Sequence, residues 1–374
     1  MDFRVMISFI AALIMGFLFI PRIVKVAIRK DLVARPNHRT SHTGRVPNVG
    51  GISIFVSFIL AFLFASDFSL DNKTQFLVFA IMILFFVGLY DDVMIISAKR
   101  KLIGELFAVA AMIFLGNFRL TNLHGFFGVH EIPYFASILL TFFVTIVIIN
   151  AINLIDGIDG LASGVGMLVS LFYGIYFILI DSIQLSIIAF SLLGALIPFF
   201  IYNVFAKRCK IFMGDAGALV LGVLLAALTV MFNEINIYDT EIYHVNNAPV
   251  VSICILVLPM FDTIRVFTIR IFHKKSPFVP DKNHLHHMFL ALGCNHKQST
   301  GILLFINMIY IGAGLLFQSI PSLFFFAIIF FSCILWSEIL RLLIKSREKV
   351  KESQCNEKIV VENEINTWNG KRFS

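Results

Sequence analysis

The chain has 374 residues, of which 59% are hydrophobic and only 14% are charged, and its formal net charge is +7. A mean hydropathy of +0.90 excludes a soluble globular domain of this length. The apolar residues stand in continuous runs rather than in alternation, which excludes a β-barrel and predicts an all-α, polytopic membrane protein.

Eleven apolar runs are long enough to cross a bilayer as helices. They cover residues 5–21, 49–66, 75–90, 102–118, 132–152, 161–180, 183–203, 216–232, 248–269, 300–317 and 321–344. The first run is followed by Arg22 and Lys25 rather than by a small-residue cleavage site, which indicates a retained span. Residues 1–344 therefore form one predicted membrane domain, and the charged residues 345–374 are expected to form a flexible cytoplasmic tail.

The basic residues predict the orientation. With alternate loops on opposite sides, only Arg4, Lys73 and Arg119 fall on one side, and all other Lys and Arg fall on or just inside the opposite side. By the positive-inside rule the crowded side is the cytoplasm, so the N-terminus is expected outside and the C-terminus inside. Within the ninth run Pro259 predicts a kink, beyond which the cytoplasmic half of the helix diverges from the bundle.

The fifth run ends in a polar stretch, N-A-I-N-L-I-D-G-I-D-G-L-A, at residues 150–162. Asn150 and Asn153 are three residues apart and share a helix face, so both amides can reach one ligand. The Asp-Gly pairs that begin at Asp156 and Asp159 predict a break between helices. A pair of ordinary turns is the alternative, but ionisable residues at the end of a membrane span indicate a function.

Two further motifs lie on the same predicted face. Arg39 and His42 precede a Pro-x-x-Gly-Gly turn that begins at Pro47; they could bind phosphate or simply belong to a positive-inside loop. Asp91 and Asp92 end the third run and are followed by a basic cluster. Adjacent carboxylates on a helix point about 100° apart, so only one of them is expected to face a given ligand.

The remaining cytoplasmic loops add an aspartate and three histidines. Asp215 lies between glycines at the start of a helix, where free N–H groups favour anions, so a divalent cation that bridges the two would explain it. His284, His286 and His287 could bind a transition metal or, through imidazole N–H groups, a phosphate. The five cysteines are scattered, which indicates neither a disulfide framework nor a zinc ribbon.

Carboxylates, a cation position and basic groups on one membrane face indicate phosphoryl transfer, and the apolar surroundings indicate a lipid substrate. A secondary transporter is the main alternative, but it needs a site that is reachable from both faces, usually at a repeat interface. The acids here cluster at the inner helix ends and no repeat is visible. A structural scaffold would leave the carboxylates unexplained.

From about Pro36 to Gly293 the sequence resembles the polyprenyl-phosphate N-acetylhexosamine-1-phosphate transferases of glycosyltransferase family 4. It looks closest to the bacterial branch that loads N-acetylglucosamine-1-phosphate onto undecaprenyl phosphate. The motifs that carry the resemblance are Pro36-Asn37, Arg39, His42, Pro47 with Gly50-Gly51, Gly88-Leu-Tyr-Asp-Asp92, Lys101-Leu102, residues 150–162, Phe212-Met-Gly-Asp-Ala-Gly217 and the run from Ser276 to His287.

The resemblance implies a role for each matched residue. Four carboxylates would be catalytic: Asp91, Asp92, Asp156 and Asp159. Eight side chains would bind substrate: Arg39, His42, Lys101, Asn150, Asn153, His284, His286 and His287. Mg²⁺, or Mn²⁺ in its place, would be held by Asp215 with Asn153 close to it. The implied partners are a UDP-sugar, undecaprenyl phosphate and the membrane lipid, without nucleic acid, and members of this fold can form a homodimer.

The implied reaction is an attack by an oxygen of the lipid phosphate on the β-phosphorus of the UDP-sugar, with UMP leaving. It would initiate O-antigen, common-antigen or teichoic-acid synthesis at the bacterial cytoplasmic (inner) membrane. Because a phosphate monoester has a second pKa of about 6, the acceptor is already largely dianionic, and a general-base role for Asp91 is a hypothesis beside positioning or metal binding. UDP-N-acetylglucosamine is the expected donor; another UDP-N-acetylhexosamine or a UDP-muramoyl-peptide is the alternative. The turn that begins at Pro47 disfavours the peptide donor.

Overall fold

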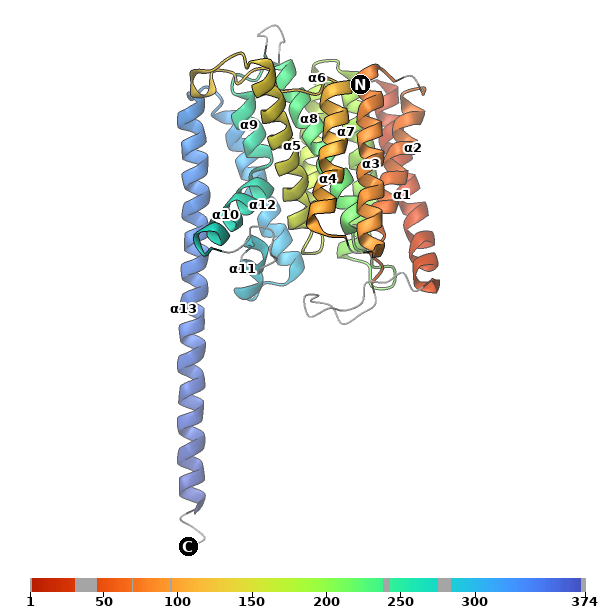
Figure 1. Ribbon diagram of the computed structural model, residues 1–374. Helices are drawn as coiled ribbons and strands as arrows, with labels where there is room; N and C mark the ends of the chain where they lie inside the picture. The colour runs from red at the N-terminus through yellow and green to blue at the C-terminus, as the bar shows by residue number, and fades with distance from the viewer. Residues whose placement is uncertain are drawn as a thin grey trace.

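The computed structural model describes residues 2–30, 46–68, 70–94, 96–237, 243–274 and 284–370. Across these ranges the chain is helical, with one isolated β-bridge between Asn122 and Glu131 (Figure 1). The elements are α1 (Phe3–Arg29), α2 (Gly50–Ala65), α3 (Asn72–Met94), α4 (Ala98–Ala110), the π-helix η1 (Ala111–Leu115), the 3-10 helix η2 (Phe126–Gly128), α5 (Tyr134–Ile155), α6 (Leu161–Leu179), α7 (Ile183–Val204), α8 (Gly214–Ile235), α9 (Ala248–Ile255), α10 (Val257–Phe272), α11 (Leu285–Ala291), α12 (His296–Leu316) and α13 (Ser322–Gly370).

The predicted class of all-α, polytopic membrane protein is confirmed. Within the described ranges eight helices are long and apolar enough to cross a membrane, and the bent pair of α9 and α10 makes a ninth if it is one span. α2 is apolar but has only 16 residues. The run predicted at 102–118 is divided between α4 and η1, where the helix widens to a π-helix. Each of the eleven predicted runs thus falls on one helix or on two consecutive helices.

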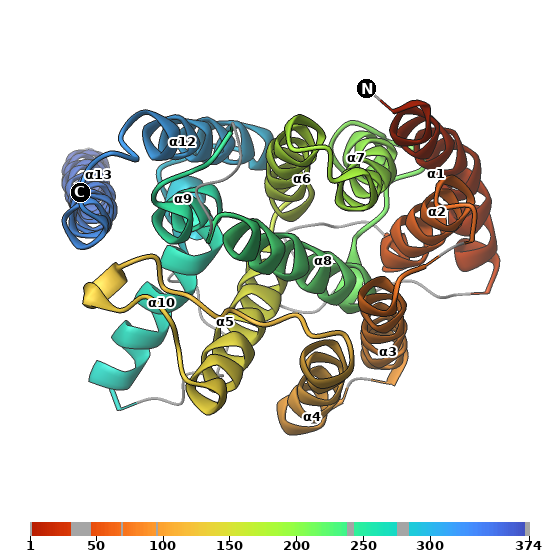
Figure 2. The same cartoon turned by 90° about the horizontal axis from the view of Figure 1, so that it is seen from above.

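The helices surround α8, which stands in the middle of the bundle (Figure 2). Of a continuous apolar stretch of 18 residues in α8, 89% are buried, against 67% or less in the other seven long apolar helices of the described residues. Small residues let the neighbours approach closely. A Cβ atom added at Gly222 would lie 2.7 Å from the Cα of Ile149 on α5. The first turn of α8 carries Asp215, so the centre of the bundle and the polar motifs are joined in one helix.

The ninth predicted span is broken, as Pro259 predicted, but the bend lies before the proline. α9 and α10 meet at 79° around Leu256. Because Pro259 has no N–H to donate, the carbonyl of Ile255 lacks its helical partner. It accepts a hydrogen bond from Nδ2 of Asn307 on α12 instead, at 3.1 Å. The break is thereby stabilised by a neighbouring helix, and α10 leaves the bundle sideways (Figure 1).

The two ends of the chain lie at opposite ends of the bundle, and α13 extends far beyond it (Figure 1). The backbone is helical as far as Gly370, and the flexibility expected of residues 345–374 stays a prediction. This segment is rich in Lys and Glu, which are good helix formers, so high charge and helix formation coexist here.

Candidate active site

The site begins with a close contact between the start of α2 and the start of α8. The backbone N–H of Gly50 donates to the carbonyl of Phe212 at 2.8 Å, and that of Gly51 donates to the carbonyl of Met213 at 2.7 Å. A Cβ atom at Gly51 would lie 2.2 Å from the backbone nitrogen of Gly217. The Pro-x-x-Gly-Gly turn therefore packs directly, backbone against backbone, on the loop that presents Asp215.

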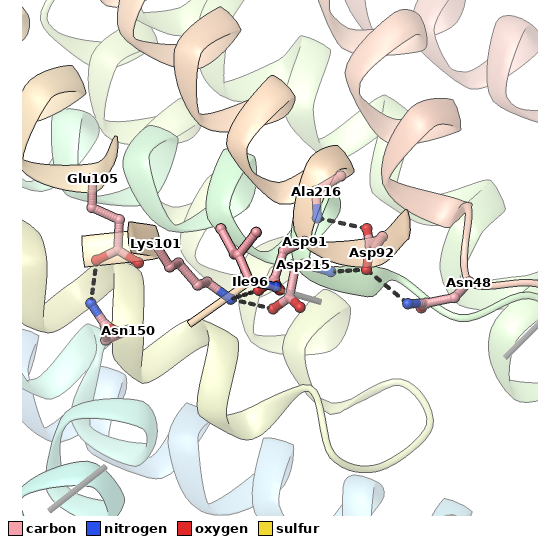
Figure 3. A network of polar contacts seen from close by, with 9 residues as sticks. All are labelled: Asn48, Asp91, Asp92, Ile96, Lys101, Glu105, Asn150, Asp215 and Ala216. Atoms are coloured by element: carbon pink, nitrogen blue, oxygen red, sulfur yellow. Dashed lines mark hydrogen bonds and ion pairs between the residues drawn. The ribbon is translucent and has the colours of Figure 1, made fainter. Parts of the chain in front are cut away.

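α3 approaches the same turn of α8 from the other side. A Cβ atom at Gly88 would lie 2.4 Å from the Cα of Ala216. One helical turn later come Asp91 and Asp92, which this contact places beside the N-terminus of α8 (Figure 3). Glycine at position 88 is therefore required for the approach of the two helices.

Asp92 caps α8 from outside that helix. Its Oδ1 accepts hydrogen bonds from the backbone N–H of Asp215 and from Nδ2 of Asn48, both at 2.8 Å. Its Oδ2 accepts a hydrogen bond from the backbone N–H of Ala216 at 3.0 Å (Figure 3). The first N–H groups of a helix have no partner within the helix, and a carboxylate near them is stabilising. The contacts of Asp92 are those of a helix cap, and its catalytic role stays a prediction.

Asp91 points elsewhere, as expected for adjacent residues of a helix. Its Oδ1 accepts a hydrogen bond from the backbone N–H of Ile96 at 2.8 Å, and its Oδ2 lies 3.3 Å from Nζ of Lys101. The same ammonium group donates a short hydrogen bond to Asp215 (Figure 3). Asp91 and Asp215 thus converge on one positive charge, while Asp92 faces the helix end. The two adjacent side chains thus have different partners, and which of them faces a ligand stays a prediction.

The convergence of two carboxylates fits the implied Mg²⁺. Among the described residues no group of three or more His, Cys, Asp or Glu side chains could hold an ion without help. Mg²⁺ commonly takes one or two carboxylates and fills its other positions with water and substrate phosphates. Asp91 and Asp215 supply such a pair, and the Lys101 ammonium occupies the position of the positive charge between them. Asn153 lies near the C-terminal end of α5 and is half-buried, and its role as a metal ligand stays a prediction.

The Asp-Gly-Ile-Asp-Gly segment forms the predicted break between α5 and α6. Asp156 ends α5 and is half-buried. Burial, followed by the charges of Asp215, Asp92 and Asp159, raises the pKa of Asp156 well above its usual range. The smaller contributions of these three carboxylates place Asp156 within electrostatic reach of them. A positive charge placed among them would be strongly favoured.

Asp159 is anchored to the neighbouring loop rather than free in the site. Its buried carboxylate lies 2.6 Å from Nζ of Lys210 and 3.7 Å from Nδ1 of His296, and its carbonyl accepts a hydrogen bond from Thr300 at 2.7 Å. A second link runs through Asn203, which accepts from the backbone N–H of Gly160 at 2.6 Å. The predicted nucleotide-sugar residue is thus tied to the loop before α8.

The histidine run is held by Asp262, which α10 carries out of the bundle. Oδ2 of Asp262 accepts a hydrogen bond from Nδ1 of His284 at 2.9 Å, and Oδ1 accepts from the backbone N–H of Leu285, also at 2.9 Å. Nη2 of Arg265 lies 3.5 Å from Oδ1. Asp262 and His284 are both buried. The carboxylate therefore orients the ring and caps α11 at the same time.

The imidazole rings pack against the Asp-Gly segment. The rings of His284 and His286 stack at 5.6 Å between centroids, and His287 follows at 4.3 Å from His286. A Cβ atom at Gly157 would lie 2.9 Å from Nε2 of His286. Burial, followed by the charge of His287, lowers the pKa of His286 to about 3, so this ring is neutral at physiological pH. Any contact of His286 with a phosphate would use a neutral N–H group.

Comparisons with known proteins identify the family of the chain. Residues 74–233 match the family model described as Glycosyl transferase family 4. An undecaprenyl-phosphate alpha-N-acetylglucosaminyl 1-phosphate transferase of Yersinia pestis is 32% identical over 290 residues, which is 76% of each chain. The chain belongs to glycosyl transferase family 4.

Two further relatives carry related names. The protein of the same name from Escherichia coli K12 is 32% identical to this family 4 member over 289 residues, which cover 76% of this chain and 75% of the relative. A probable undecaprenyl-phosphate N-acetylglucosaminyl 1-phosphate transferase of Bacillus subtilis is 30% identical over 331 residues, which cover 84% of this chain and 86% of the relative. The match to the family model spans the motifs from Gly88 to Gly217.

The site of this family 4 protein includes residues that the sequence did not point to. Lys210 pairs with Asp159, Asp262 with His284, and Glu105 with Asn150. Lys210 stands in a basic loop and Asp262 follows the kink-forming proline. The sequence therefore drew attention to both regions, but it did not indicate which residue each side chain pairs with. Arg39 and His42 lie outside the described residues, and their substrate-binding roles stay predictions.

Asp92→Ala is expected to lower the free energy of unfolding of this family 4 protein. Three hydrogen bonds are lost and two part-buried N–H groups of α8 remain without a partner, each of which costs about 1–3 kcal/mol when fully buried. Thermal unfolding in detergent measures the change. Asn48→Ala removes only one of the three bonds and should have a smaller effect. Equal stability of Asp92→Ala and the unsubstituted protein would show that the cap does not contribute.

Proposed function

We propose that the protein transfers N-acetylglucosamine-1-phosphate from UDP-N-acetylglucosamine to undecaprenyl phosphate and releases UMP. The observation that carries the proposal is the convergence of Asp91 and Asp215 on Lys101 beside the capped N-terminus of α8, at one end of an apolar bundle. The names of the relatives support the lipid and sugar partners. A membrane-embedded site suits an acceptor whose tail stays in the bilayer while its phosphate reaches the helix ends.

Phosphoryl transfer depends mainly on positioning and on neutralising charge. A phosphate oxygen of the lipid forms a bond to the β-phosphorus, the bond from that phosphorus to the UMP oxygen breaks, and UMP leaves with the electron pair. The dianionic acceptor needs no proton removed. The ammonium group of Lys101 attracts the phosphates. Mg²⁺ between Asp91 and Asp215, or Mn²⁺ in its place, would supply further charge neutralisation when bound.

The remaining site residues have complementary roles in this proposal. Asp156, Asp159 and Asn153 would bind the nucleotide sugar beside the metal, and His284, His286 and His287 would bind phosphates, with His286 as a neutral donor. The fixed position of Asp159 on Lys210 suits a rigid recognition residue rather than a proton carrier. The contact between His286 and Gly157 brings the two groups of residues together.

The topology belongs to the same proposal. Eleven helical passes, with the broken pair as one of them, would put the N-terminus outside and the C-terminus in the cytoplasm, consistent with termini at opposite ends of the bundle. The site would then face the cytoplasm at the bacterial inner membrane, where nucleotide sugars are available. The product would initiate a cell-envelope polysaccharide.

UMP release by the purified full-length chain in detergent tests the function. We expect release only when undecaprenyl phosphate, a UDP-sugar and Mg²⁺ are all present. Chelation by EDTA should lower the rate at least about a hundredfold, because a charge-neutralising group worth several kcal/mol is removed, and added Mg²⁺ should restore it. Release in the absence of metal would contradict the metal part of the proposal.

The choice of donor decides between the alternatives. UDP-N-acetylglucosamine should give the fastest release, and UDP-N-acetylgalactosamine and a UDP-muramoyl-peptide serve as competitors. A faster rate with one of these would keep the reaction and change the donor. Absence of UMP with every donor would overturn the transferase proposal and favour the secondary transporter, for which flux of a labelled substrate into vesicles is the measurement.

A further inference from the structure

A buried acid stands beside the site without a place in the proposed reaction. Glu105 lies on α4, one turn after Lys101, and is only 1% exposed. Its Oε2 accepts a hydrogen bond from Nδ2 of Asn150 on α5 at 2.6 Å (Figure 3). A carboxyl group inside an apolar bundle is costly unless its hydrogen bonds are satisfied. Its presence at this position therefore calls for an explanation beyond packing.

The hydrogen bonds fix which way the Asn150 amide faces. Its Nδ2 has two hydrogens, and both are used: one bonds to Glu105 and the other to the backbone carbonyl of Ile146 at 3.0 Å. A backbone carbonyl can only accept a hydrogen bond, so the nitrogen must lie on this side whether Glu105 is ionised or neutral. Oδ1 is left as the only group of the amide that can meet a ligand.

We infer that Glu105 is a positioning residue that holds Asn150 as a hydrogen-bond acceptor in the active site. The inference rests on the proposed function, and it adds a chemical restriction to it. Oδ1 of Asn150 can bind groups that bring a hydrogen, namely a hydroxyl or amide N–H of the sugar nucleotide or a water on the metal ion. It cannot donate to a phosphate oxygen. Of the two amides predicted to reach one ligand, this one contributes oxygen only.

The position of the pair agrees with this role. Figure 3 shows Glu105 and Asn150 beside the ion pair of Lys101 and Asp215. Asn150 is half-buried and lies on the same helix as Asn153, just before the break at Asp156. A rotation of its amide by half a turn would present two N–H groups to the same ligand. Glu105 prevents that rotation, since it accepts the hydrogen bond that the nitrogen donates.

A double-mutant cycle tests the inference. Glu105→Met keeps the volume and removes the acceptor; it should lower kcat/KM for UMP release about 10–100-fold, as loss of an orienting partner does elsewhere. Glu105→Gln keeps an acceptor oxygen and should stay within about threefold, in the range of a retained neutral hydrogen bond. Glu105→Met with Asn150→Ala should be no worse than Asn150→Ala alone. Additive losses, or full activity of Glu105→Met, would overturn the inference.

Two titrations identify the source of the hydrogen. If Oδ1 meets the sugar nucleotide, Glu105→Met raises KM for UDP-N-acetylglucosamine and leaves the Mg²⁺ dependence unchanged. If it meets a metal-bound water, the Mg²⁺ concentration for half-maximal rate rises and the donor KM is unchanged. A change confined to the KM for undecaprenyl phosphate would contradict the inference, because that ligand offers oxygens without hydrogens at neutral pH.

Thermal unfolding separates this inference from the proposed function. The unsubstituted protein and the three variants of the cycle can be compared without any substrate. Coupling between positions 105 and 150 in the unfolding midpoints is expected from their direct hydrogen bond. If the unsubstituted protein released no UMP with any donor, the function would fail while this coupling would still be measured. If the enzyme were active but positions 105 and 150 showed no coupling in the unfolding midpoints, the inference would be overturned and the proposed function would stand.

Discussion

Asp215→Asn is expected to lower the rate of UMP release about a hundredfold to a thousandfold, the range observed when a preorganised charge-stabilising group is removed. The substitution keeps the shape of the side chain and removes its charge. The carboxylate of Asp215 pairs with Lys101 and converges with Asp91 on one cation position, so its loss removes half of that negative pair. Little change in stability is expected, because Asp92 rather than Asp215 caps the helix.

Asp181→Asn provides the matched control for this variant. Asp181 lies in the turn between α6 and α7, at the opposite end of α6 from the Asp-Gly segment, and its φ of 56° is a conformation that Asn tolerates. The same change of charge there should leave UMP release and the unfolding midpoint unchanged. If Asp215→Asn retained more than about a tenth of the rate, well above the loss of one such group, Asp215 would not be the central metal ligand.

Gly88→Ala should have a comparable effect through geometry alone. The new Cβ would lie 2.4 Å from Cα and 2.5 Å from N of Ala216, and backbone atoms cannot move aside as a flexible side chain can. α3 and α8 must therefore separate, which moves Asp91 and Asp92 away from Asp215. A displacement near 1 Å can cost about a hundredfold in rate, and overpacking costs about 1–3 kcal/mol of stability.

Gly312→Ala is the control for the general effect of a Gly→Ala substitution inside a helix. Gly312 lies inside α12, and a Cβ atom there would meet nothing within 4 Å. Since Ala is a better helix former than Gly by up to about 1 kcal/mol, this variant should be as stable as the unsubstituted protein or slightly more stable. UMP release and thermal unfolding of both variants measure the contrast. Equal activity of Gly88→Ala and Gly312→Ala would show that the close approach is not required.

The sequence predicted the membrane helices well because a long apolar run is a local property. It also predicted the break after Asp156 and the divergence after Pro259, since glycine and proline act on their own backbone. It did not place the bend itself, which lies at Leu256. That position depends on Asn307, a residue of another helix, whose amide satisfies the carbonyl of Ile255.

The partners within the site could not be predicted in the same way. Asp92 was recognised as one of a pair, yet only the fold shows that it caps α8, more than a hundred residues further along the chain. The pairing of Asp262 with His284 depends on the 79° bend between α9 and α10, because Asp262 lies on α10 beyond that bend. Glu105 belongs to none of the sequence motifs and stands inside the apolar run 102–118. Its role appears only when α4 and α5 are side by side.

The central place of α8 separates the chemistry from the lipid around it. Helices that face lipid adjust their tilt when the hydrocarbon thickness of a bilayer changes. α8 is shielded by protein along nearly its whole length, and its first turn is fixed through Gly51, Gly88 and Asp92. The depth of Asp215 is therefore set by its neighbours in the chain. Membranes of different thickness would present the same reaction centre to an acceptor lipid, while the outer helices absorb the mismatch.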